Sequence, residues 1–97
     1  MREASRKLAP GKAAAQSSLQ ASYTPKQGQY LAFIYYYTKI HGRSPAEADM
    51  QGYFRVSPPA VHQVVLSLEK MRFIERTPGQ ARSIKLLLPR EQLPDLT

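Results

Sequence analysis

The first hydrophobic pattern along the chain has the spacing of a helix. Apolar and aromatic residues return every three to four positions between residues 25 and 41, so they share one face. These positions are Leu31, Ile34 and Thr38, flanked by Tyr30, Phe33 and Tyr37. Thr24 can cap the first turn, Pro25 suits the first helical position, and Gly42 can end the last turn. The pattern therefore predicts a helix from about 25 to 41.

Two further helices are predicted after short gaps. Ser44-Pro45 repeats the start signal, and a helix over 46–54 would place Met50 and Phe54 on its inner face. Ser57-Pro58-Pro59 then opens a third helix, because the first backbone N–H groups of a helix have no partner within it. Its apolar stripe, at i, i+3, i+4, i+7 and i+10, consists of Val61, Val64, Val65, Leu68 and Met71.

The pattern changes from helical spacing to alternation after the third helix. Residues 73–77 have the composition of a strand, and residues 82–88 alternate between apolar and polar. The alternating apolar residues are Ile84, Leu86 and Leu88. Pro78-Gly79-Gln80-Ala81 between the two strands is typical of a turn. The predicted fold is mainly α with a small β-hairpin, in the order of a winged helix-turn-helix: a three-helix bundle plus a two-stranded wing.

Charge narrows the choice of partner. The length of 97 residues is enough for one domain. The chain's fourteen basic and seven acidic residues give a net charge of +7. Nine basic and four acidic residues lie in 23–88, so the surplus belongs mainly to the part that should fold. Such a surplus favours nucleic acid or an acidic membrane surface. The chain has no cysteine, which fits a reducing compartment, and no apolar run approaches the ~18 residues of a membrane span.

The two ends of the chain differ from its middle. Residues 1–22 are rich in Ala, Ser, Lys and Arg and poor in large apolar residues, so we expect a flexible basic arm there. The same composition also resembles a mitochondrial transit peptide, which stays open as an alternative. Residues 23–88 form the expected domain, and residues 89–97 are a tail with too little apolar content to predict an element.

The outward face of the third helix carries side chains suited to reading DNA in the major groove. Glutamine can pair with adenine, histidine can donate to guanine, and alanine or proline can touch the thymine methyl group. The candidate base-reading residues, none of them acidic, are Ser57, Pro59, Ala60, His62 and Gln63. The candidate phosphate and wing contacts are Lys26, Arg55, Lys70, Arg76, Gln80 and Arg82. This distribution predicts double-stranded DNA as the partner, with no membrane.

Several segments together resemble a known family. They are Thr24-Pro25-Lys26-Gln27, Gly42-Arg43-Ser44-Pro45, residues 57–62, residues 66–70 and residues 73–84. Over 24–88 the chain closely resembles the N-terminal DNA-binding domain of LexA repressors. The resemblance implies a sequence-specific transcriptional repressor, bacterial, cytoplasmic and associated with the nucleoid, and it places base contacts on the same five residues of the third helix.

The chain also departs from the family pattern. LexA repressors carry a C-terminal protease half with a Ser-Lys dyad, whereas this sequence stops at Thr97, so we expect no self-cleavage and no pairing through that half. Arg55 stands at a turn position usually held by glycine, which strains the bend if φ is positive there. We expect a monomer or weak dimer that pairs as a homodimer on inverted half-sites, through the aromatic surface of the first helix and Leu93 and Leu96.

Other function classes have weaker support. No nucleophile–base pair and no glycine-rich phosphate loop is visible, so we expect neither enzymatic activity nor a cofactor. His41 and His62 without cysteine do not make a metal site, and His41 suits the C-terminal end of a helix. The alternatives are a winged helix that binds protein or RNA, and a nonspecific architectural DNA-binding protein. A protein-binding version should show apolar or acidic residues on the third helix.

Overall fold

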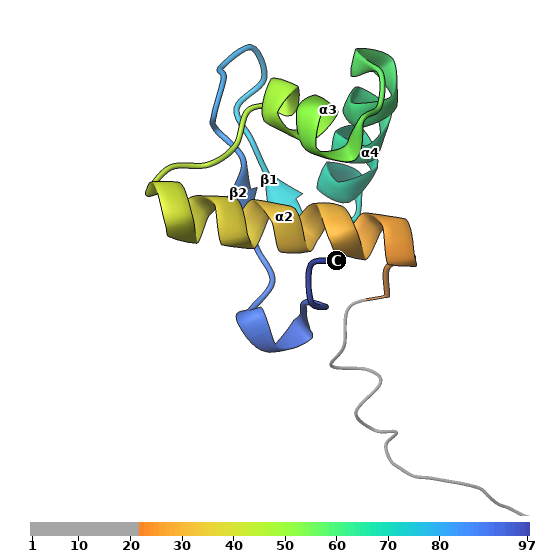
Figure 1. Ribbon diagram of the computed structural model, residues 1–97, viewed down its shortest axis with the longest axis vertical. Coiled ribbons are helices and arrows are strands. Elements are labelled where there is room, and N and C mark those ends of the chain that lie inside the picture. Colours follow the sequence, from red (N-terminus) through yellow and green to blue (C-terminus); the bar gives the residue numbers. More distant parts are fainter. Residues whose placement is uncertain (1–21) are drawn as a thin grey trace, which may run out of the picture.

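The computed structural model describes residues 22–97, which form three helices and a small antiparallel hairpin (Figure 1). The elements are α2 (Pro25–His41), α3 (Glu47–Phe54), α4 (Pro58–Lys70), β1 (Ile74–Glu75), β2 (Lys85–Leu86) and the short 3-10 helix η1 (Arg90–Gln92). This order confirms the predicted mainly helical winged helix-turn-helix. The arm expected at 1–22 lies, apart from Ser22, outside the described residues. None of the described helices is long and apolar enough to cross a membrane.

Helix α2 has the predicted bounds and is the centre of the molecule. Thr24 and Gln27 cap its start reciprocally, each side chain accepting from the other residue's backbone N–H. Gly42, at φ 73°, ends the helix, with its N–H donating to the carbonyl of Thr38. Residues 30–34 are all buried, which requires neighbours on every side of the helix. Figure 1 shows α3 and α4 on one side of α2 and the C-terminal segment on the other.

The C-terminal tail packs on α2 instead of remaining free. The Tyr23 hydroxyl donates to the carbonyl of Gln92. Gln29 bonds both to the carbonyl of Asp95 (2.9 Å) and to the N–H of Thr97 (2.9 Å). Leu93 and Leu96 are partly buried against the hydrophobic core. Part of each leucine is therefore taken up by contacts within the protein, and their role in pairing stays a prediction.

The second helix begins later than its sequence signal suggested. Ser44-Pro45 does not start it: the N-cap is Ala46, whose N–H donates to Asp49 Oδ2 at 2.8 Å. The Ser44 hydroxyl instead donates to the carbonyl of Arg82 (2.8 Å). On the inner face of α3, Met50 is buried and the partly buried Phe54 stacks on Tyr30, with ring centroids 4.2 Å apart.

The stripe of α4 forms much of the core, although its last position does not. Val61, Val65 and Leu68 have no exposed surface. Met71 is 43% exposed because the helix ends at Lys70. Thr38 of α2 is also exposed, and its hydroxyl donates to the carbonyl of Ile34 within the helix. Met71 and Thr38 fit the helical spacing, but no neighbouring element among the described residues covers them.

The hairpin is shorter than predicted. Ile74 pairs with Leu86 and Glu75 with Lys85, and the remaining residues of 73–77 and 82–88 are not strand. One reason is backbone conformation. Within the described residues, the non-glycine residues with positive φ are Arg55 (56°), Arg72 (63°) and Arg82 (56°), and a left-handed residue cannot continue a strand. The wing is therefore mostly loop on a two-residue base.

Candidate nucleic-acid interface

The first two turns of α4 project from the protein body. Ser57 caps them, with its hydroxyl oxygen accepting from the N–H of Ala60 (3.3 Å), and Pro58 takes the first helical position. Of the predicted base-reading residues, Ser57, Pro59, His62 and Gln63 are exposed, and Ala60 is partly exposed. The sharp turn before the helix puts Arg55 at positive φ, the strained bend expected from its place in a glycine position.

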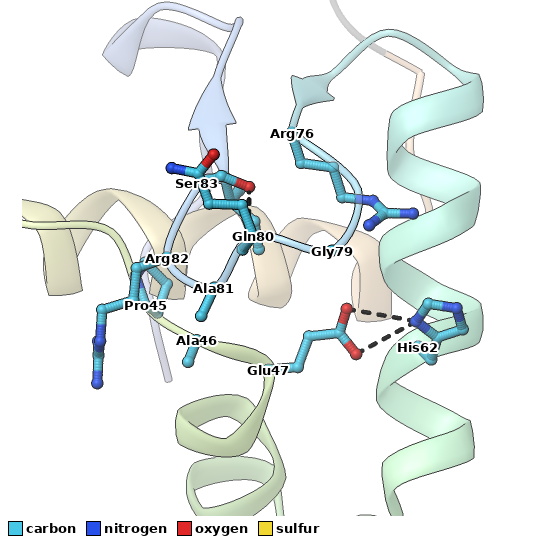
Figure 2. Close-up of a pocket in the computed structure, with 11 residues that line it drawn as sticks. Pro45, Ala46, Glu47, His62, Arg76, Gly79, Gln80, Ala81, Arg82 and Ser83 are labelled. Carbon is cyan, nitrogen blue, oxygen red and sulfur yellow. Dashed lines mark hydrogen bonds and ion pairs between the residues drawn. The ribbon is translucent and has the colours of Figure 1, made fainter.

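A groove of about 360 Å3 separates these turns from the wing (Figure 2). One wall is the wing loop, and the opposite side holds His62 of α4 and the start of α3. Four predicted site residues lie along it, and they are His62, Arg76, Gln80 and Arg82. The fold therefore brings the start of α4 and the wing together around one concave surface.

The wing loop is held by its own hydrogen bonds. Ser83 Oγ accepts from the N–H of Thr77 (2.9 Å) and lies 2.9 Å from the carbonyl oxygen of Gln80. Gly79, at φ 80°, makes the reversal at the tip. The exposed tip residues, Gln80 among them, are thus presented by a loop with a defined conformation.

Arg82 is tied into the protein instead of pointing freely from the wing. Its Nη1 donates to the hydroxyl of Tyr37 (3.2 Å), the carbonyl of Ser44 (3.2 Å) and Oδ2 of Asp49 (3.1 Å). The carbonyl of Arg82 in turn accepts from the Ser44 hydroxyl. This cluster, which we call the Arg82 clamp, joins the wing to α2, to the loop after it and to α3.

The ionisation of the clamp follows from these contacts. The N–H of Ala46 lowers the pKa of the Asp49 carboxyl, and Arg82 lowers it further, against the opposing effect of partial burial. The Tyr37 hydroxyl raises the pKa of Arg82, and the charge of Asp49 acts in the same direction. Each partner therefore favours the charged form of the other.

The other predicted cations differ in how free they are. Arg76 is only 15% exposed, and its Nε donates to Oε1 of Glu69 on α4 at 3.1 Å. Lys26, Arg55 and Lys70 are exposed. Neither Lys26 nor Lys70 lines the groove: Lys26 lies beside a separate hollow with residues of the α3–α4 turn, and Lys70 is on the last turn of α4.

Sequence reasoning missed one acidic residue at this surface. Glu47, the first residue of α3, lines the groove and reaches His62. The sequence near Glu47 does not predict this contact, because the two residues come from different helices. The partners of Arg82 were missed for the same reason. Within residues 22–97, no group of three or more His, Asp or Glu side chains is placed to hold a metal ion.

Comparison with known proteins agrees with this architecture. No protein-family model matches the chain. It is 37% identical over 70 residues to the LexA repressor of Thermosipho melanesiensis, covering 72% of this chain and 35% of that protein. It is 39% identical over 64 residues to the LexA repressor of Thermosipho africanus, covering 66% and 32%. The chain thus spans about a third of the length of these relatives. The resemblance is confirmed, and the chain is similar to the N-terminal domain of LexA repressors over most of its own length.

Proposed function

We propose that this chain is a sequence-specific regulator of transcription that binds double-stranded DNA, acting as a repressor without self-cleavage. The observation that carries the proposal is the exposed start of α4, where His62 lines the groove beside the wing and Gln63 is exposed. A helix end of this kind fits the ~12 Å wide major groove, where side chains reach the base edges. The LexA relatives support the same class of function.

In this proposal Ser57, Pro59, Ala60, His62 and Gln63 face the bases. Gln63 is exposed and can pair with adenine through both ends of its amide. The hydroxyl of Ser57 already accepts the cap hydrogen bond, and its O–H and second lone pair remain for a base edge. Pro59 and Ala60 offer apolar contact to a thymine methyl group.

The phosphate contacts divide by how free each side chain is. Lys26, Arg55, Lys70 and Gln80 are exposed and supply the main contacts to the backbone. Arg76 and Arg82 have acidic partners within the protein, so they reach phosphate only with the nitrogen atoms that those partners leave free. The main role of these two arginines in the proposal is to hold the wing in position.

Pairing on DNA completes the proposal. A single winged domain buries roughly 600–1,000 Å2 on DNA, which seldom gives tight and selective binding alone. We therefore expect cooperative binding of two copies on inverted half-sites about one helical turn apart. Leu93 and Leu96 are partly buried, and Ile40 of α2, 74% exposed, is the most exposed of the large apolar side chains available for such a contact among the described residues. Titration of duplexes with one and two half-sites tests this, because equal affinity per site would show that the domain binds alone.

The main experiment is duplex binding by the 97-residue protein as a function of salt. Release of counterions from several phosphates should give a log–log slope of about −3 to −6. Gln63→Ala should cost about 1–3 kcal/mol on the preferred duplex and relax one base position. Arg82→Ala, the matched wing variant, should weaken preferred and random duplexes alike. A folded protein that binds no duplex at low salt would contradict the proposal, and equal binding to all duplexes would indicate an architectural protein.

A further inference from the structure

Glu47 and His62 form a pair on the surface that faces DNA in the proposed function, on which this inference rests. His62 Nδ1 lies 3.3 Å from both carboxylate oxygens of Glu47. The two side chains come from the first residue of α3 and the second turn of α4, and they meet across the groove (Figure 2). His62 is 48% and Glu47 31% exposed, so the pair borders solvent where a ligand can reach it.

The chemistry of the pair fixes which nitrogen of His62 carries the proton. An ionised carboxylate can only accept hydrogen bonds, so Nδ1 facing Glu47 must be the donor. In the neutral imidazole the other nitrogen, Nε2, is then an acceptor. Figure 2 shows this second nitrogen on the side of the ring away from Glu47.

We propose that Glu47 is a positioning residue that sets the base preference of His62. With Nδ1 donating to Glu47, the acceptor at Nε2 matches the exocyclic amino group of adenine or cytosine in the major groove. It does not match guanine, whose major-groove edge offers two acceptors. The protein therefore reads adenine or cytosine at the position that faces His62, as long as the imidazole is neutral.

Protonation of the imidazole reverses the preference. The cation donates from both nitrogens, so Nε2 then favours guanine while Nδ1 keeps its bond to Glu47. The other charged groups along the groove are Arg76, paired with Glu69, and Arg82, paired with Asp49. These pairs leave Glu47 as the carboxylate that lines the groove and bonds to His62.

Glu47 also has general effects on stability and charge that do not involve His62. A carboxylate in the first turn of a helix stabilises the helix dipole whatever lies beside it, and any acid near DNA repels phosphate. Both effects would act on all duplex sequences equally. Control of the imidazole tautomer, by contrast, changes the preference at one base pair and leaves the others as they were.

The test selects bound sequences from a random duplex pool at about pH 8. Wild type should enrich adenine or cytosine at one position, and His62→Ala should lose that enrichment. Glu47→Ala should weaken the same preference by about 3- to 10-fold, the worth of one hydrogen bond. Glu47→Gln should retain part of it, because the amide oxygen can still accept from Nδ1 but the amide NH2 can donate to it instead. Glu75→Ala on β1 is the matched control, since it removes a carboxylate away from the groove.

Repeating the selection in acidic buffer should move the enrichment toward guanine for wild type and not for His62→Ala. If folded Glu47→Ala behaves like Glu75→Ala and shifts all sequences together, the positioning role is wrong. Enrichment of guanine by wild type at about pH 8 would also overturn it. If wild type binds no duplex at all, the proposed function itself fails, and the base assignment fails with it.

Discussion

Asp49 is the residue whose removal should disturb the start of α3 and the Arg82 clamp together. Asp49→Ala deletes the acceptor that holds the N–H of Ala46 at 2.8 Å, a capping bond worth about 1 kcal/mol. It also deletes an ion pair in which Arg82 is 34% and Asp49 28% exposed, so solvent screening makes that part small. A loss of about 1 kcal/mol should lower the melting temperature of a domain of this size by about 4–8 °C.

The effect of Asp49 depends on pH with a definite sign. Its folded-state pKa is lowered, so the stability it contributes is present above the unfolded-state pKa of about 3.9 and is lost as pH falls through the folded value. Asp49→Asn keeps an oxygen that can accept from Ala46 but removes the charge. Wild type should therefore melt above Asp49→Asn near neutral pH, and the two should converge in acid.

Thermal melts followed by circular dichroism across the acid range measure both effects. Binding to the preferred duplex, followed in parallel, reports whether loosening the clamp moves the wing. A melting temperature for Asp49→Ala within about 1 °C of wild type would refute the reasoning. A gap between wild type and Asp49→Asn that persists in strong acid would show that the charge of Asp49 is not responsible.

Three other predictions concern the core and the chemistry of the chain. Gly28→Ala should destabilise by about 1 kcal/mol, because a Cβ there would lie 2.8 Å from the Tyr23 ring and overpacking outweighs the gain in helix propensity; urea unfolding measures it. Tyr30→Phe should stabilise by about 1 kcal/mol, because the buried Tyr30 hydroxyl has no hydrogen-bond partner among the described residues. Alkaline incubation should leave the 97-residue chain intact by mass spectrometry, since no described serine is hydrogen-bonded to a lysine, and defined fragments would contradict this.

Features encoded by neighbouring residues were predictable from the sequence. The bounds of α2 follow from Thr24-Pro25 and Gly42, and three positions of the α4 stripe are buried as expected. The start of α3 was not predictable from Ser44-Pro45, because Ser44 bonds to the wing, 38 residues away. The packing of residues 89–97 was missed because its contacts on α2 are nearly 70 residues apart in the chain.

In the candidate site, too, features set by local sequence were predictable and contacts between distant segments were not. The exposed face of α4 follows from helical periodicity, so His62 and Gln63 could be placed on the outside from spacing alone. The partners of His62 and Arg82 could not, because Glu47 and Asp49 approach from another helix. Arg82 is an example: its charge and place in the sequence predict a cation of the wing, but only the fold shows that its side chain joins the wing to α2, to the loop after it and to α3.

If the chain binds DNA as proposed, its arginines with positive φ connect the heat resistance of the protein with its rate of association with DNA. Arg55, Arg72 and Arg82 sit where α3 meets α4, where α4 meets β1, and in the wing. A left-handed conformation costs an L-residue roughly 1–2 kcal/mol that glycine avoids. Glycine at Arg55 or Arg72 would relax the backbone but remove a cation that attracts a polyanion over long range, whereas glycine at Arg82 would also remove the Arg82 clamp. In the proposed function, a variant with glycine at Arg55 or Arg72 is therefore expected to resist heat better but to associate with DNA more slowly.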